Sequence, residues 1–147
     1  RHPDEQPKSL GNANVIIFGM GRTGTAAYLE LEQAGHQPVG LDADAYALEA
    51  HLKAGRHAIF ADAEDSSFWN AVSLSGITAA ILAMDDLEAK LIAARMLREK
   101  GFDGPIVSHA LYAEHAETIR AAGADQTYLT MQEAGRSLAG HAIEALS

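Results

Sequence analysis

A glycine-rich turn is the stretch whose residue types and spacing are best suited to chemistry. Residues 19–24 read Gly-Met-Gly-Arg-Thr-Gly, follow a short apolar run and fit the pattern G-x-G-x-x-G. In such a turn the first glycine permits a sharp bend after a strand, and the second lets a pyrophosphate approach the backbone. The third lets the next helix pack closely against the sheet. Unpaired N–H groups at the helix start bind phosphate, and Arg22 can add a charge-assisted contact. The turn therefore predicts a phosphate-binding site.

An acidic residue at the end of the second apolar run completes this pattern. Asp42 lies 18 residues after Gly24. A carboxylate in this place accepts hydrogen bonds from ribose hydroxyls and repels a 2′-phosphate. The sequence therefore favours NAD(H) or a free adenine nucleotide such as AMP or ATP over NADP(H), with Asp44 as an alternative to Asp42. A second interpretation stays open, in which the turn keeps its glycines for packing and binds nothing.

Alternating apolar and helical segments surround this turn and indicate an α/β fold. The predicted strands are 14–18, 37–41, 57–61, 79–84, 105–108 and 126–129. The predicted helices are 21–34, 44–54, a short one carrying Phe68, Trp69 and Val72, then 87–100, 113–122 and 131–146. Strands that alternate with helices form parallel sheets through right-handed crossovers. We therefore expect a Rossmann-like, doubly wound, parallel six-stranded sheet in the order 3-2-1-4-5-6, followed by a C-terminal helix.

Composition excludes several classes of function. The 147 residues suit one domain, and 11 basic against 20 acidic residues, without a basic cluster, argue against a nucleic-acid partner. The sequence has no cysteine, which excludes disulfides, thiol catalysis and cysteine-ligated metals. The seven histidines show no metal-ligand spacing, so we expect them at the surface or at a pocket rim and predict no metal. No apolar run approaches the roughly 20 residues that span a bilayer.

The chain divides into three parts. Residues 1–13 are polar and contain prolines, which indicates a linker or the edge of a longer chain. Residues 14–130 form the predicted nucleotide-binding domain. Residues 131–147 form the last helix, whose apolar stripe either packs on its own sheet or serves as a dimerisation element.

From Asn14 onward the sequence resembles the nucleotide-binding regulatory domain of potassium transport proteins, the TrkA-N or RCK N-terminal type. The resemblance rests on VIIFGMGRTG, LDAD, FADAED, AAILAMDD and HAETIRAAGAD. It implies phosphate contacts at the glycine turn, ribose contacts at Asp42, adenine contacts after the third strand and a pocket closed by the end of the fourth. The candidate cofactor-binding residues are Gly19, Met20, Gly21, Arg22, Thr23, Gly24, Asp42, Ala43, Asp62, Ala63, Met84 and Asp85.

The final segment, MQEAGRSLAGHAIEAL, is most similar to the Kef-type branch of potassium efflux proteins. That resemblance implies a domain on the cytoplasmic face of the inner (cell) membrane, attached to or associated with a membrane-embedded cation–proton antiporter. It also implies a homodimer in which the last helix is a crossover helix that packs on the second subunit. His109 stands where Kef proteins commonly carry an arginine of a glutathione-responsive surface, and Ala61 and Glu64 depart from the family's Gly-Asp-Ala-Thr element.

An enzyme is the main rival to this regulatory interpretation. The cofactor-binding domain of an NAD-dependent oxidoreductase would carry the same glycine turn. However, none of the four tyrosines is followed four residues later by lysine, so the Tyr-x-x-x-Lys pair of short-chain dehydrogenases is absent. We therefore expect a sensor that is not an enzyme, in which a bound nucleotide shifts the population of two dimer shapes. An assembly module with an empty pocket is the third possibility.

Overall fold

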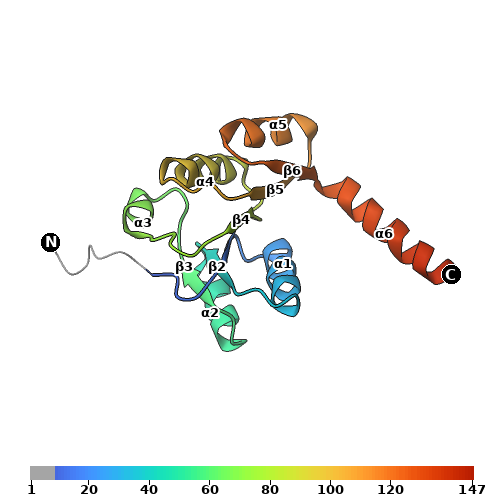
Figure 1. The fold of residues 1–147 in the computed structure, drawn as a ribbon, viewed down its shortest axis with the longest axis horizontal. Coiled ribbons are helices and arrows are strands. Elements are labelled where there is room, and N and C mark those ends of the chain that lie inside the picture. The colour runs from blue at the N-terminus through green and yellow to red at the C-terminus, as the bar shows by residue number, and fades with distance from the viewer. Residues whose placement is uncertain (1–8) are drawn as a thin grey trace.

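Six parallel strands form one sheet in the order β3-β2-β1-β4-β5-β6 (Figure 1). The computed structural model describes residues 9–147. The strands are β1 (Val15–Phe18), β2 (Pro38–Asp42), β3 (Ala58–Phe60), β4 (Ala79–Leu82), β5 (Ile106–Ala110) and β6 (Gln126–Leu129). This order confirms the predicted Rossmann-like fold.

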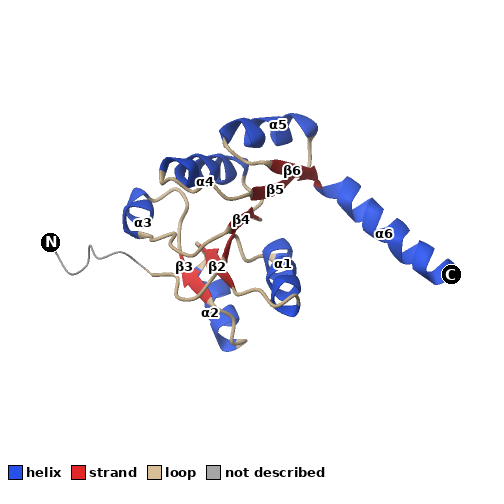
Figure 2. Cartoon of the chain, in the orientation of Figure 1, coloured by secondary structure: helices blue, strands red, loops and turns tan. Residues whose placement is uncertain are grey.

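The helices cover both faces of the sheet (Figure 2). They are α1 (Arg22–Gln33), α2 (Ala45–Lys53), α3 (Ser66–Ala71), α4 (Leu87–Glu99), α5 (Ala113–Ala122) and α6 (Thr130–Leu146). In Figure 1, α1 and α2 lie on one face, whereas α3, α4 and α5 lie on the other. None of the helices within residues 9–147 is long and apolar enough to cross a membrane.

The apolar run of β1 explains why it lies at the centre of the sheet. Ile16 and Phe18 point into the larger core with α3, α4 and α5, while Val15 and Ile17 point into the smaller core with α1. Successive strand residues face opposite sides, so a continuous apolar run suits a strand that is covered on both faces. The predicted packing of Phe68 and Trp69 in the core is also confirmed, because both are buried.

Several predicted boundaries move by a few residues. The fourth strand was expected to reach Met84 but ends at Leu82, beyond which the chain turns alongside Gly19. β5 was expected to end at Ser108 but continues to Ala110, because β6 pairs with it through Ala110 and Leu129.

The end of the predicted linker belongs to the folded domain. Leu10 and Ala13 are buried and pack in the larger core. Residues 1–8 of that linker lie outside the described part of the chain.

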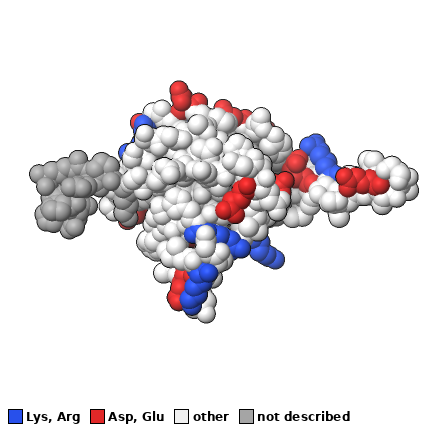
Figure 3. All heavy atoms as spheres, turned by 60° about the horizontal axis from the view of Figure 1, so that its bottom comes forward, with Lys and Arg blue, Asp and Glu red and all other residues white. Residues whose placement is uncertain are grey.

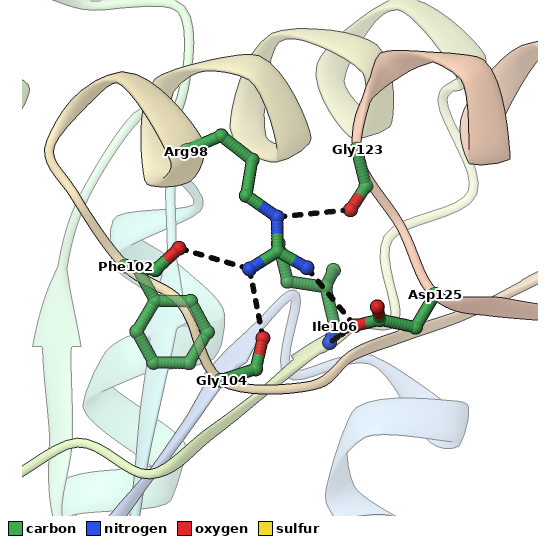
Figure 4. Close-up of polar contacts among 6 residues, drawn as sticks. All are labelled: Arg98, Phe102, Gly104, Ile106, Gly123 and Asp125. Carbon is green, nitrogen blue, oxygen red and sulfur yellow. Dashed lines mark hydrogen bonds and ion pairs between the residues drawn. The ribbon is translucent and has the colours of Figure 1, made fainter.

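Arg98 joins the three segments that meet at the amino ends of β5 and β6 (Figure 4). Its guanidinium donates to the carbonyls of Gly123, Phe102 and Gly104 at 3.0, 2.9 and 2.8 Å, and to the Asp125 carboxylate at 2.9 Å. Asp125 also accepts the Ile106 N–H at 2.7 Å. A single side chain thereby satisfies the carbonyls that the loops around α4 and α5 leave unpaired.

The last helix projects away from the rest of the molecule (Figure 1). No residue of α6 is buried, and Leu138 is 71% exposed. The interpretation in which its apolar stripe packs on its own sheet is therefore wrong. Residues after Thr130 extend past the sheet edge, so they have no sheet surface to cover.

Candidate functional site

A cleft of about 1180 Å³ lies at the carboxyl ends of the strands. It runs from the β2 and β3 ends, over the turn between β1 and α1, to the β5 end and the first turn of α6. The strand order reverses between β1 and β4, and clefts at such a switch point are where open α/β sheets bind ligands.

The structure brings ten of the twelve predicted residues to this cleft. They are Gly19, Gly21, Arg22, Thr23, Asp42, Ala43, Asp62, Ala63, Met84 and Asp85. They come from four separate segments, so the fold brings together residues that lie up to 66 positions apart in the sequence.

Met20 and Gly24 do not line the cleft. The Met20 side chain is buried over Gly40, where an added Cβ would lie 2.4 Å from its sulfur. An added Cβ on Gly24 would lie 1.7 Å from the Gly19 carbonyl oxygen. The third glycine therefore serves the close packing of α1, and Met20 anchors the turn from behind.

The start of α1 leaves its N–H groups facing the cleft. Gly21 is the N-cap, and no side chain caps the helix. The starts of α5 and α6 also lack a side-chain cap, whereas α2, α3 and α4 are each capped by an aspartate. An ideal Cβ on Gly21 meets nothing within 4 Å. Open space, uncapped amides and the adjacent Arg22 are together suited to an anion, since a helix N-terminus carries partial positive charge.

Asp42 is fixed by two backbone amides. Its Oδ2 accepts the Met20 N–H and its Oδ1 accepts the Asp44 N–H, each at 2.8 Å. A carboxylate has about four acceptor positions, so each oxygen retains one for a ribose hydroxyl. Asp44, the alternative ribose ligand, caps α2 by accepting the N–H groups of Tyr46 and Ala47.

The two acidic residues after β4 have different roles. Asp86 caps α4 by accepting the Glu88 N–H at 3.1 Å, and Asp85 lies exposed on the cleft wall. Lys90 is buried and lines the same wall, with its ammonium 2.5 Å from the His109 carbonyl oxygen. Burial lowers the pKa of Lys90, while the Asp85 and Asp86 carboxylates partly offset this.

Sequence reasoning missed Lys90, although a signal was present. The residue lies three positions after Leu87 and one before Leu91, inside the apolar stripe of α4. A charged residue in such a stripe must either leave the core or find a partner within it. The first turn of α6 was missed as well, although the carboxyl end of β6 must reach the same edge of a parallel sheet.

His109 connects the far end of the cleft to α6. Its Nδ1 lies 2.7 Å from the Thr130 hydroxyl, and both residues line the cleft together with Met131. Burial lowers the pKa of His109, and the Lys90 ammonium lowers it further. Its predicted place at the pocket rim therefore agrees with the structure.

His51 is not at the surface, which corrects the prediction for that histidine. It is only 7% exposed, and its ring lies behind the glycine turn. No local pattern predicts this burial, because the contact joins α2 to a turn 31 residues earlier.

Comparison with protein families gives one match of high coverage. The sequence model of the TrkA-N domain matches residues 15–130. Curated proteins contain no significant match to this chain.

Three solved structures illustrate the similarity of fold. The chain is similar to the NAD(P)-binding domain of an exopolyphosphatase-related protein from Archaeoglobus fulgidus, with 23% identity and a TM-score of 0.80 over 90% of this chain and 98% of that one. It is similar to the GsuK channel bound to NAD, with 19% identity and a TM-score of 0.69 over 86% of this chain and 23% of that one. It is also similar to the Kef CTD of Shewanella denitrificans in its AMP-bound form, with 19% identity and a TM-score of 0.67 over 91% and 81%.

Proposed function

Because the chain belongs to the TrkA-N domain family, we propose that its cleft binds an adenine nucleotide and that this binding regulates a membrane transporter. The observation that carries the proposal is the start of α1. Its uncapped N–H groups, the open space at Gly21 and Arg22 all face a cleft at the switch point of the sheet. This arrangement suits a phosphate group in both shape and charge.

The proposed ligand is NAD(H) or AMP/ATP. The Asp42 carboxylate retains acceptor positions for ribose hydroxyls, and its charge opposes a 2′-phosphate. Among proteins of similar fold, one is described with bound NAD and another with bound AMP, which supports adenosine as the shared part of the ligand. In this proposal Asp62 and Ala63 border the adenine, and Met84 and Asp85 close the pocket.

The proposed partner is a second copy of the chain together with a membrane protein. We assign residues 14–130, together with the preceding segment whose Leu10 and Ala13 pack in the core, to the nucleotide-binding domain and residues 131–147 to dimerisation. The associated unit is a potassium efflux or cation–proton antiporter protein, with this domain on the cytoplasmic face of the inner membrane. Thr130 and Met131, the first residues of α6, line the cleft. A ligand bound there therefore contacts the start of α6 and can bias the direction of that helix.

Regulation without catalysis is favoured over an oxidoreductase. Hydride transfer between an alcohol and a carbonyl usually uses a group that exchanges a proton with the substrate. Tyr112, the tyrosine of the cleft, lacks a lysine four residues later, and its ring stacks edge-on against His115. The alternative function, the cofactor-binding domain of an NAD-dependent oxidoreductase, requires a substrate-binding part outside residues 1–147.

Calorimetric titration with AMP, ADP, ATP, NAD⁺ and NADH tests the proposal, with NADPH as the control for the 2′-phosphate. We expect binding of at least one unphosphorylated-ribose ligand and weaker binding of NADPH than of NADH. Absence of binding by every ligand at millimolar concentration would contradict the proposed function and favour an assembly module. Turnover of NADH with a substrate would favour the oxidoreductase.

A further inference from the structure

Met20 holds the glycine turn in place through its backbone hydrogen bonds and its buried side chain. Its N–H donates to Asp42 Oδ2 at 2.8 Å, and its carbonyl oxygen accepts the Thr25 hydroxyl at 3.1 Å. Its side chain is 2% exposed and packs over Gly40. The backbone of this one residue therefore joins the turn, the start of α1 and the carboxylate at the end of β2.

The Met20 carbonyl has a second partner on a different helix. His51 Nε2, near the end of α2, lies 2.7 Å from this oxygen, and the ring is buried. On the other side of the ring, Arg56 Nη1 lies 3.1 Å from His51 Nδ1. Neither His51 nor Arg56 lines the cleft, so their contact with the Met20 carbonyl lies behind the site.

These two partners determine the tautomer of His51. A guanidinium has only donors, so Nδ1 must accept from Arg56. A carbonyl oxygen only accepts, so Nε2 must carry the hydrogen and donate it to Met20. Arg56 thereby orients a ring whose single N–H is aimed at the turn.

We propose that His51, with its tautomer set by Arg56, is a positioning residue that fixes the Met20 peptide and through it the Asp42 carboxylate for recognition of the ligand's ribose. The inference rests on the proposed function. His51 holds the Met20 carbonyl, which belongs to the peptide between Met20 and Gly21. The N–H of the same residue, in the peptide before it, holds Asp42 Oδ2. Removing the His51 contact leaves the carboxylate in place but frees its orientation, which lowers the strength of hydrogen bonds to two adjacent hydroxyls.

The test compares AMP with 2′,3′-dideoxy-AMP, which lacks the hydroxyls that Asp42 would bind. We expect the parent chain to prefer AMP, and His51→Leu to reduce that preference about tenfold, the equivalent of one or two hydrogen bonds. His51→Gln places an amide N–H near the position of Nε2 and should retain most of the preference. Arg56→Met should reduce the preference for AMP without removing the His51 ring. This variant tests the proposal if His51→Leu fails to fold.

Lys53→Met is the matched control. Lys53 is a cation of α2, the helix that carries His51 and precedes Arg56. Its side chain is 76% exposed, and it pairs with Glu49 rather than with His51. This variant should keep the parent's preference for AMP, which separates the effect of Arg56 from a general loss of positive charge.

The outcomes distinguish this inference from the proposed function. A parent chain that binds neither probe at millimolar concentration would contradict the proposed function, and this inference with it. A parent that prefers AMP, with His51→Leu and Arg56→Met variants that keep the same preference, would contradict the inference alone. Equal weakening of both probes in these variants would also overturn it, because that pattern indicates a general structural role.

Discussion

The three glycines of the turn at residues 19–24 meet three different physical constraints. Gly19 has a φ of +94° and lies where an added Cβ would be 2.6 Å from the Met84 nitrogen. Gly24 has no room because the Gly19 carbonyl occupies the place of its Cβ. Gly21 alone of the three has free space, so packing does not require a glycine there, and in our proposal this space holds the ligand's phosphate.

Substitution of Gly24 should therefore affect folding directly. We expect Gly24→Ala to lower the free energy of unfolding by at least about 3 kcal/mol, because the clash is with backbone that cannot rotate away. Gly140→Ala makes the same chemical change on exposed α6, on the side opposite the apolar stripe, where nothing lies within 4 Å. There we expect a free energy that is unchanged or up to about 1 kcal/mol higher. Urea unfolding of both variants measures the difference, and equal effects would show that the turn is loosely packed.

His109 makes the stability of the chain depend on pH. Its pKa is lowered from the ordinary 6.5 by burial and by the Lys90 ammonium. Below pH 6.5 the unfolded chain therefore binds more protons at this residue than the folded chain does, so the stabilisation is present above 6.5 and is lost as the pH falls. His109→Asn retains a side chain that can hydrogen-bond to the Thr130 hydroxyl but does not titrate.

Thermal unfolding at pH 7.5 and pH 5.5 tests this expectation. The melting temperature of the parent should fall more on acidification than that of His109→Asn, since the other histidines are common to both. A larger fall in the variant would reverse the assigned sign of the pKa shift.

At the scale of elements, the Arg98 cluster holds the ends of α4 and α5 to the sheet (Figure 4). Arg98→Met keeps the apolar stem but leaves the Gly123, Phe102 and Gly104 carbonyls without this donor. We expect a loss of about 2–4 kcal/mol in the free energy of unfolding. Arg98→Lys should lose most of the same amount, because an ammonium cannot reproduce the planar fork.

Arg136→Met is the control for that prediction. Arg136 pairs with Glu133 on the surface of α6, and its side chain is 71% exposed. Exposed pairs contribute less than about 1 kcal/mol, so urea unfolding should detect little change. A similar loss for Arg98→Met and Arg136→Met would contradict the role assigned to the Arg98 cluster.

The elements differ in how far the sequence alone predicts them. The strand order and the glycine turn were predictable from local signals. These are the spacing of apolar residues, the glycines that end helices and the G-x-G-x-x-G pattern. The bounds of α5 and β6 were predicted to the residue. The roles of Met20, His51 and Lys90 were not predictable in this way, because each depends on a contact with a segment distant in sequence. The surface that covers the apolar stripe of α6 could not be predicted either, because a stripe of apolar residues does not identify its partner.

At the scale of the whole molecule, α6 is the feature that the single chain leaves unexplained. Figure 3 shows it projecting from a body on whose visible face acidic and basic side chains are interspersed. Leu138 lies on the apolar stripe, while Ser137 lies on the polar side of the same helix. An exposed apolar stripe of this length is typical of a surface that another protein covers.

Sedimentation velocity tests the proposed homodimer. We expect the parent chain to sediment as a dimer and Leu138→Asp to sediment as a monomer, because a carboxylate buried in an apolar interface is costly. Ser137→Asp adds the same charge outside the stripe and should remain dimeric. A parent chain that is monomeric at every concentration, or a Leu138→Asp variant that stays dimeric, would contradict this role of α6.

The central claim, that the turn between β1 and α1 binds a phosphate, is tested most directly at Gly21. Its φ of −75° is accessible to any residue, and its Cβ position is empty, so Gly21→Leu should fold with the melting temperature of the parent. The leucine side chain would occupy the space beside the uncapped N–H groups where we place the phosphate. Calorimetric titration should then show nucleotide affinity reduced by at least about tenfold relative to the parent, or abolished. A folded Gly21→Leu variant that binds the nucleotide as tightly as the parent would contradict the account.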